Sequence, residues 1–213
     1  MTFPKVFRSR LGVCVAAGAM LGVCTGWAQN AVANTITYTL YATAVTAGGV
    51  GEWYDSNNAI GAANGTYAKA IYYDYAFTTS PLTATAFGAW TLPANQTITN
   101  VKVAVRSKWS NNQTEWMNFG ENSTGSMTYS WVSISGDFAW REKDVTSSRG
   151  AWTKANVDAL DVGAARVWSN WPEWVDLYVD AFRVTVTSVP EPAGLILLGL
   201  GLGLLGLRRR VTT

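Results

Sequence analysis

Between its two ends, this chain contains short runs in which every second residue is apolar. Over residues 35–45, one parity carries Ile36, Tyr38 and Leu40, while threonines take most of the other positions. Such period-2 alternation is typical of a β-strand with one buried face, whereas an amphipathic helix needs a period near 3.6. The alternation therefore favours an all-β fold.

Similar short runs recur along the chain and are separated by turns rich in Gly, Asn and Ser. We expect strands at 35–45, 71–79, 87–92, 97–108, 127–135, 138–145, 157–162 and 174–187. Eight or nine such strands, without a convincing helix of three turns, predict a single β-sandwich or jelly-roll domain over residues 34–188. In the last run the apolar parity changes near Ala181 and Phe182, which predicts a β-bulge there.

Several residue types on which enzymes rely are missing from this domain. Histidine is absent from the whole chain, and both cysteines, Cys14 and Cys24, precede residue 34. Ser-His-Asp and Cys-His catalysis, disulfides, and imidazole or thiolate metal sites are therefore excluded within the domain, and we name no catalytic residue.

Residues 34–189 carry ten basic and thirteen acidic side chains, a formal charge of −3. Nucleic acid is not an expected partner, because there is no basic footprint.

The C-terminus has three parts in a fixed order. They are Pro190, Glu191 and Pro192; an uncharged run over residues 193–207; and Arg208, Arg209 and Arg210. The prolines keep the first part extended. As a helix the uncharged run would span about 22 Å, which is short for a membrane crossing, and the arginines behind it favour the cytoplasmic side. We expect a marginal transmembrane helix that tethers the domain outside the inner membrane before processing.

This tail resembles the PEP-CTERM sorting signal of Gram-negative bacteria. The resemblance implies that an exosortase recognises the chain and processes it near Pro190-Glu191-Pro192, which sends it to the cell surface or the extracellular matrix. It also implies an association with exopolysaccharide and with biofilm-forming or floc-forming cells. A permanent membrane anchor is the alternative interpretation of the same residues.

The N-terminus has the organisation of a secretory signal peptide. Three basic residues precede an apolar stretch over residues 11–27, and Ala31 and Ala33 form the small-x-small pattern that signal peptidase recognises. We therefore expect signal peptidase to cleave between Ala33 and Asn34, which makes residues 1–33 the signal peptide.

Tryptophan is abundant: of the eleven in the chain, only Trp27 lies in the predicted signal peptide. Indole rings stack on the apolar faces of sugars, so exposed tryptophans on a β-sandwich indicate a glycan-binding surface. Trp90, Trp131 and Trp140 lie in strand-like runs, and we expect them to be structural. The candidate glycan-binding residues lie in turns and are Trp168, Asn170, Trp171, Glu173 and Trp109.

Acidic residues give a weaker signal. Two groups could supply oxygen ligands for calcium, namely Glu52, Asp55, Asn57 and Asn58 in one loop, and Asp137, Glu142 and Asp144 around one strand end. Neither spacing matches a known calcium-binding loop, so solvated surface carboxylates are the simpler interpretation and no cofactor is expected. The same carboxylates are the one route to glycoside hydrolysis, and no spacing places two of them at the separation required.

The sequence therefore predicts an exported, non-enzymatic β-sandwich that acts at the cell surface or in the matrix. Two functions remain open. The domain binds a glycan through exposed tryptophans, or it is a structural matrix or adhesion protein whose aromatic residues only fill the core. A carboxylate-dependent glycoside hydrolase is the third alternative.

Overall fold

The computed structural model describes residues 34–49, 52–70, 79–110, 115–167 and 176–191. By its internal contacts the chain separates into Thr35–Val189 and a second unit of Met1–Asn34 with Pro190–Thr213. The predicted signal peptide, the predicted helix over 193–207, and the predicted strand over 71–79 except Thr79 lie outside the described residues. Within the described ranges, no helix is long and apolar enough to cross a membrane.

The described part of the chain is almost entirely β-structure. Its strands are β1 (Ile36–Ala47), β2 (Trp53–Tyr54), β3 (Ala68–Ala70), β4 (Leu82–Phe87), β5 (Gln96–Trp109), β6 (Glu115–Glu121), β7 (Thr128–Ile134), β8 (Ala139–Asp144), β9 (Val162–Arg166) and β10 (Leu177–Pro190). The short helices are η1 (Ser56–Ala59), η2 (Thr146–Ser148) and α2 (Lys154–Asp158). The predicted all-β class is confirmed.

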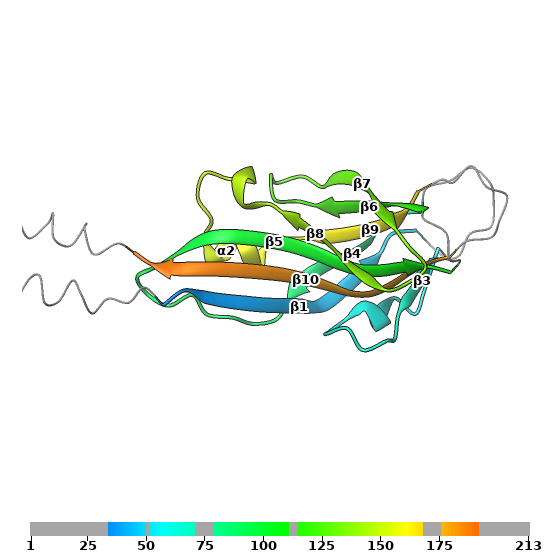
Figure 1. Ribbon diagram of the computed structural model, residues 1–213, viewed down its shortest axis with the longest axis horizontal. Coiled ribbons are helices and arrows are strands. Elements are labelled where there is room, and N and C mark those ends of the chain that lie inside the picture. Colours follow the sequence, from blue (N-terminus) through cyan, green and yellow to red (C-terminus); the bar gives the residue numbers. More distant parts are fainter. Residues whose placement is uncertain (1–33, 50–51, 71–78, 111–114, 168–175, 192–213) are drawn as a thin grey trace, which may run out of the picture. The chain divides into compact units, whose positions relative to one another are not determined.

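Strand β1 joins two layers of sheet. Its residues 36–41 pair antiparallel with residues 183–188 of β10, and its residues 42–47 pair antiparallel with β4. The register shifts at Ala42, Ala44 and Val45, where β1 passes from one layer to the other. The first layer adds β2, β3, β5 and β8 to β10, and the second adds β9, β6 and β7 to β4. Figure 1 shows β10 lying between β1 and β5 in the first layer of this sandwich.

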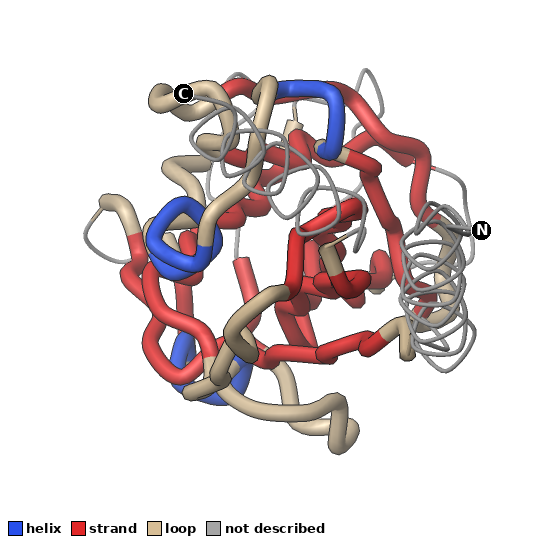
Figure 2. Tube along the Cα trace, turned by 90° about the vertical axis from the view of Figure 1, so that its left-hand side faces the viewer, coloured by secondary structure: helices blue, strands red, loops and turns tan. Residues whose placement is uncertain are grey.

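The core lies between the two layers. The side chains of β5 that point inward are Val101, Val103 and Val105, which are fully buried. On β6, the inward side chains are Met117 and Phe119. These five residues belong to one hydrophobic cluster. Seen along the strands, the layers enclose this interior (Figure 2). Burial of alternating apolar side chains is thus what specifies the strands and holds the layers together.

Two predicted strands are wrong. The run over 87–92 contributes only Phe87 to a strand, because β4 ends there. The run over 157–162 begins inside α2. The hydroxyl of Thr153 accepts a hydrogen bond from the backbone N–H of Asn156, and the Asn156 side chain accepts one from the N–H of Thr153. This capping box starts a helical turn where alternation predicts a strand.

The predicted change of buried parity in β10 is confirmed. Leu177 and Val179 are buried in its first part, and Phe182, Val184 and Val186 in its second. The change falls between the pairing of residues 177–179 with β3 and the pairing of residues 183–188 with β1. Both pairings are regular and neither includes residues 180–182, so the β-bulge expected near Ala181 and Phe182 stays a prediction.

Candidate carbohydrate-binding face

The predicted glycan-binding residues are only partly covered by the structure. Trp168, Asn170, Trp171 and Glu173 lie outside the described residues. Trp109 at the end of β5 is 2% exposed and belongs to the hydrophobic core. The structure therefore corrects the prediction for Trp109, because its ring has no face free for a sugar.

Several other tryptophans are fixed by contacts within the domain. Indole N–H groups donate from Trp53 to the Ser80 carbonyl at 2.8 Å and from Trp152 to the Thr146 carbonyl at 2.9 Å. The guanidinium of Arg183 lies 4.2 Å from the ring centroid of Trp140. These rings serve packing and cation–π contacts, which is the structural role predicted for Trp140.

The second layer presents aromatic rings to solvent. Trp116 of β6 is 51% exposed and Trp131 of β7 is 67% exposed. Across the β6–β7 pair, Trp116 lies opposite Ser133, and Asn118 lies opposite Trp131. Directly opposite residues of an antiparallel pair point to the same side, so both tryptophans lie on one face. Trp131 therefore departs from the structural role that its strand-like run predicts.

Tyr129 extends this face toward β9. It lies opposite Gly120, and a Cβ added to Gly120 would collide with the Tyr129 ring. The ring therefore lies against the bare backbone of Gly120, a known way to cover a glycine in a sheet. A Cβ added to Gly163 would lie 3.6 Å from the Tyr129 hydroxyl oxygen, so the hydroxyl reaches over β9. Burial raises the pKa of Tyr129. A phenol is protonated near neutral pH, so this hydroxyl can act as a donor.

We name the surface formed by Trp116, Asn118, Tyr129 and Trp131 the aromatic face. Asn118 is half-buried, and its Oδ1 atom is shielded from solvent without a hydrogen-bond partner in the described part. An unpaired buried acceptor costs free energy, and because this oxygen is shielded from solvent it offers no contact to a ligand in this conformation. The face thus presents three partly exposed rings and carries no charged side chain among these four residues.

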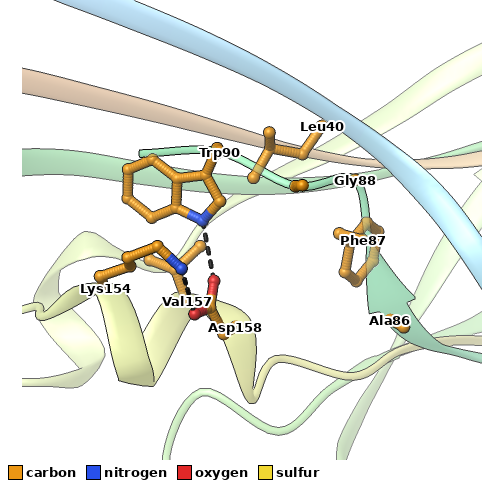
Figure 3. Close-up of a pocket in the computed structure, with 9 residues that line it drawn as sticks. Leu40, Ala86, Phe87, Gly88, Trp90, Lys154, Val157 and Asp158 are labelled. Atoms are coloured by element: carbon orange, nitrogen blue, oxygen red, sulfur yellow. Dashed lines mark hydrogen bonds and ion pairs between the residues drawn. The ribbon is translucent and has the colours of Figure 1, made fainter. Parts of the chain in front are cut away.

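A separate pocket of about 250 Å³ lies beside α2 (Figure 3). Its wall includes Leu40, Phe87 and Trp90, and its rim carries Lys154 and Asp158. The carboxylate of Asp158 accepts a hydrogen bond from Trp90 Nε1 at 2.8 Å and pairs with Lys154 Nζ at 2.5 Å. The polar groups of the pocket therefore satisfy one another, and they fasten α2 to the loop after β4. Trp90 thus has the structural role predicted for it.

Two of the acidic residues considered as calcium ligands, Glu142 and Asp144, have partners within the domain. Glu142 pairs with Lys102 at 2.9 Å and with Arg183 at 3.0 Å, and the hydrogen bond from Lys102 lowers the pKa of Glu142. Asp144 accepts hydrogen bonds from Thr146 and Asn100. Among the residues the structure describes, no group of three or more His, Cys, Asp or Glu side chains could hold a metal ion.

The sorting motif begins inside a strand. Ser188 is fully buried in β10, which ends at Pro190, and Glu191 is exposed. Pro192 and the three arginines at 208–210 lie outside the described residues, as do Ala31 and Ala33 of the predicted signal-peptidase site. Asn34, on the other side of that predicted cleavage, is exposed.

Comparison with known proteins identifies the tail. Residues 188–210 match the model of the PEP-CTERM protein-sorting motif. No curated protein matches the chain. A solved structure, CBM35 from Paenibacillus barcinonensis, is similar with 16% identity and a TM-score of 0.38 over 70% of this chain and 97% of that chain. That similarity is too low to support an inference. The motif implies export, recognition by exosortase and membrane-anchored sorting to the cell surface, and on this motif the chain is a PEP-CTERM sorting domain-containing protein.

Proposed function

We propose that this surface protein is a non-catalytic glycan-binding module, and that the aromatic face holds a neutral polysaccharide such as the exopolysaccharide of the producing cell. The observation that carries the proposal is the exposure of Trp116 and Trp131, 51% and 67%, on one face of one layer. Large exposed aromatic side chains are costly in a soluble domain and commonly mark a binding surface.

The geometry suits an extended chain. Tyr129 and Trp131 are two residues apart on β7, which separates them by about 7 Å along the strand, and Trp116 lies diagonally across on β6. Rings at this spacing offer stacking positions for successive sugars, while the Tyr129 hydroxyl is placed to meet a sugar hydroxyl.

None of the four residues of the aromatic face is charged, which favours a neutral glycan over an acidic one. A cation, Arg141, lies close by, and its Nε donates to the carbonyl of Ser133, the residue opposite Trp116, at 2.7 Å. Stacking and neutral hydrogen bonds depend little on salt, whereas recognition of uronic acids or sulfates would require arginine or lysine. We also propose that binding needs no metal, because the carboxylates of Glu142 and Asp144 are engaged within the domain.

Substitution of the two tryptophans tests the proposal. In the soluble domain over residues 34–188, Trp131→Ala or Trp116→Ala is expected to weaken binding to the producer's polysaccharide about tenfold or more. Both side chains are exposed, so the free energy of unfolding should change by less than about 0.5 kcal/mol. Affinity electrophoresis and a glycan array give the affinity, and urea unfolding gives the stability.

Control variants distinguish the aromatic face from other surfaces of the domain. Tyr54, an exposed aromatic of β2 in the other layer, supplies the matched variant Tyr54→Ala, which should bind normally. EDTA should leave the affinity unchanged. Equal binding by the wild type and both tryptophan variants would show that the aromatic face is not the binding site. Loss of binding in Trp168→Ala and Trp171→Ala instead would move the site to those two residues. A folded domain that binds no glycan would favour the structural matrix protein, and release of reducing sugar would favour the hydrolase.

A further inference from the structure

The sorting motif and the last strand of the domain share residues. The motif covers residues 188–210, and β10 covers Leu177–Pro190, so Ser188, Val189 and Pro190 belong to both. From Ser188 to Pro192 the chain can extend over at most about 14 Å. The part of the chain that exosortase recognises therefore starts within the folded sheet, without an intervening linker.

The end of β10 is held on the side of β1. Ser188 pairs with Ile36 and Thr187 with Thr37, and the hydroxyl oxygens of Thr37 and Thr187 lie 3.5 Å apart. Because residue 36 is the first of β1, this pair closes the strand end next to the predicted signal-peptidase cleavage site. The two ends of the domain are thus tied together by one antiparallel pair.

The same residues are also held on the side of β5. The Ser188 hydroxyl donates to the side-chain oxygen of Gln96, and the Thr99 hydroxyl donates to the Thr187 carbonyl at 3.4 Å. Ser188 itself is fully buried. The two strands beside β10 therefore both engage residues 187 and 188, β1 on one side and β5 on the other.

We propose that Thr37, Gln96 and Thr99 restrain sorting, because they hold the start of the motif in the sheet. Exosortase then acts on the form in which the end of β10 has separated from β1 and β5. Enzymes that bind an extended segment contact its main chain, so they compete with neighbouring strands for the same backbone groups. Strand ends open locally at far lower free energy than the whole domain. The frequency of this opening then sets the rate of processing. The proposal rests on the sorting motif and is independent of glycan binding.

A disulfide across the strand end tests the proposal. Thr37 and Thr187 lie directly opposite each other on the exposed side of the sheet, and the separation of such a pair suits a disulfide, so the test variant is Thr37→Cys/Thr187→Cys. The full-length chain is followed in exosortase-containing cells by pulse-chase, and the processed fraction is resolved by mass. The oxidised variant should be processed at least about tenfold more slowly than either single-cysteine variant, because the locked strand end opens rarely.

The matched control lies two residues further into the sheet. Thr39 and Thr185 are also opposed, so Thr39→Cys/Thr185→Cys carries the same type of cross-link while residues 187 and 188 stay free to open. This control should be processed at a rate near that of the wild type. Equal processing of both cross-linked variants and the wild type would overturn the proposal.

A second variant works in the opposite direction and needs no cross-link. Gln96→Ala removes the acceptor of the Ser188 hydroxyl, and loss of one hydrogen bond should raise the processing rate roughly three- to tenfold. Thr128→Ala, an exposed threonine at the start of β7, serves as its control and should leave the rate unchanged. A Gln96→Ala rate at or below that of the wild type would contradict the proposed role of Gln96.

Discussion

At the scale of single residues, cross-strand pairing decides whether a tryptophan is buried or exposed. On β7, Val132 is half-buried against the core and Ile134 is fully buried, so the opposite parity, which includes Trp131, faces out. The sequence shows this alternation, but it does not show that β6 is the neighbour of β7, and only that pairing brings Trp116 and Trp131 onto one surface. Pairing between strands is a long-range property, which local periodicity cannot supply.

Gly120 offers a test of how the aromatic face is built. In Gly120→Ala the new methyl group must displace the Tyr129 ring, because the two would collide. We expect glycan affinity to fall by about threefold to tenfold while the free energy of unfolding changes by no more than about 1 kcal/mol, since a partly exposed side chain can rotate away. Affinity electrophoresis alongside urea unfolding checks both quantities.

Gly125→Ala supplies the contrasting control. Gly125 has a φ of 96° in the turn before β7, and nothing lies within 4 Å of an added Cβ. This variant should lose stability through backbone strain, by about 1 kcal/mol or more, while keeping its affinity for the glycan. If both glycine variants keep full affinity, Tyr129 makes no contribution to binding.

At the scale of elements, the sequence predicts most of the long strands but misses β6, although Met117 and Phe119 alternate there, and β9, where small residues do the packing. Strands β1, β5, β7, β8 and β10 match predicted runs to within a few residues. Strand β9 is fully buried, yet two of its five residues are alanine and one is glycine, so its burial leaves no strong alternation. The helical turn α2 depends on a capping box, which a strand pattern conceals.

Asp180 connects β10 to β5 and to the loop at residues 64 and 65. It lies where the buried side of β10 changes from one set of alternate residues to the other. Its carboxylate is fully buried, pairs with Arg106 of β5, and accepts hydrogen bonds from the backbone N–H groups of Asn64 and Gly65, both at 3.3 Å. Asp180→Asn keeps an acceptor for the loop but leaves the Arg106 charge without its partner. We expect the free energy of unfolding to fall by about 1–3 kcal/mol in urea titrations.

The exposed ion pair of Lys154 with Asp158 is the comparison for this loss. Asp158 keeps 45% of its side chain exposed, so Asp158→Asn should cost no more than about 1 kcal/mol. An Asp180→Asn loss as small as that of Asp158→Asn would show that Arg106 finds water or another partner, and that the ion pair does not hold the loop on β10.

At the scale of the whole molecule, an ion pair links the two layers. Glu121 of β6 is 3% exposed, and its carboxylate accepts from Lys143 Nζ of β8 at 2.7 Å and from the Ser123 N–H at 2.6 Å. Lys143 is on the inward side of β8, opposite Val103 of β5. An inward charge on a strand near the sheet edge hinders pairing with another molecule, and here it also fastens one layer to the other.

This link makes stability depend on pH in the acid range. Burial of Glu121 acts to raise its pKa, but the hydrogen bonds from Lys143 and Ser123 outweigh burial and hold the pKa below its usual value of 4.5. A carboxyl group whose pKa is lower in the folded state stabilises the fold above its unfolded pKa, and this contribution is lost as the pH falls through the folded pKa. Glu142 and Asp144 shift in the same direction, whereas burial raises the pKa of Asp161 and opposes them.

We therefore expect the free energy of unfolding to fall steadily below about pH 4.5 and to vary little between about pH 6 and 9, since the chain has no histidine to titrate there. Urea titrations of the wild type and Glu121→Gln at a series of pH values check this. The variant should be less stable at pH 7, because Lys143 loses its partner, and its acid slope should be shallower, because one of the carboxylates with a lowered pKa is gone. The two curves should therefore approach each other toward pH 3. Parallel curves would show that Glu121 does not contribute to the acid transition and that the link between the layers depends on apolar burial alone.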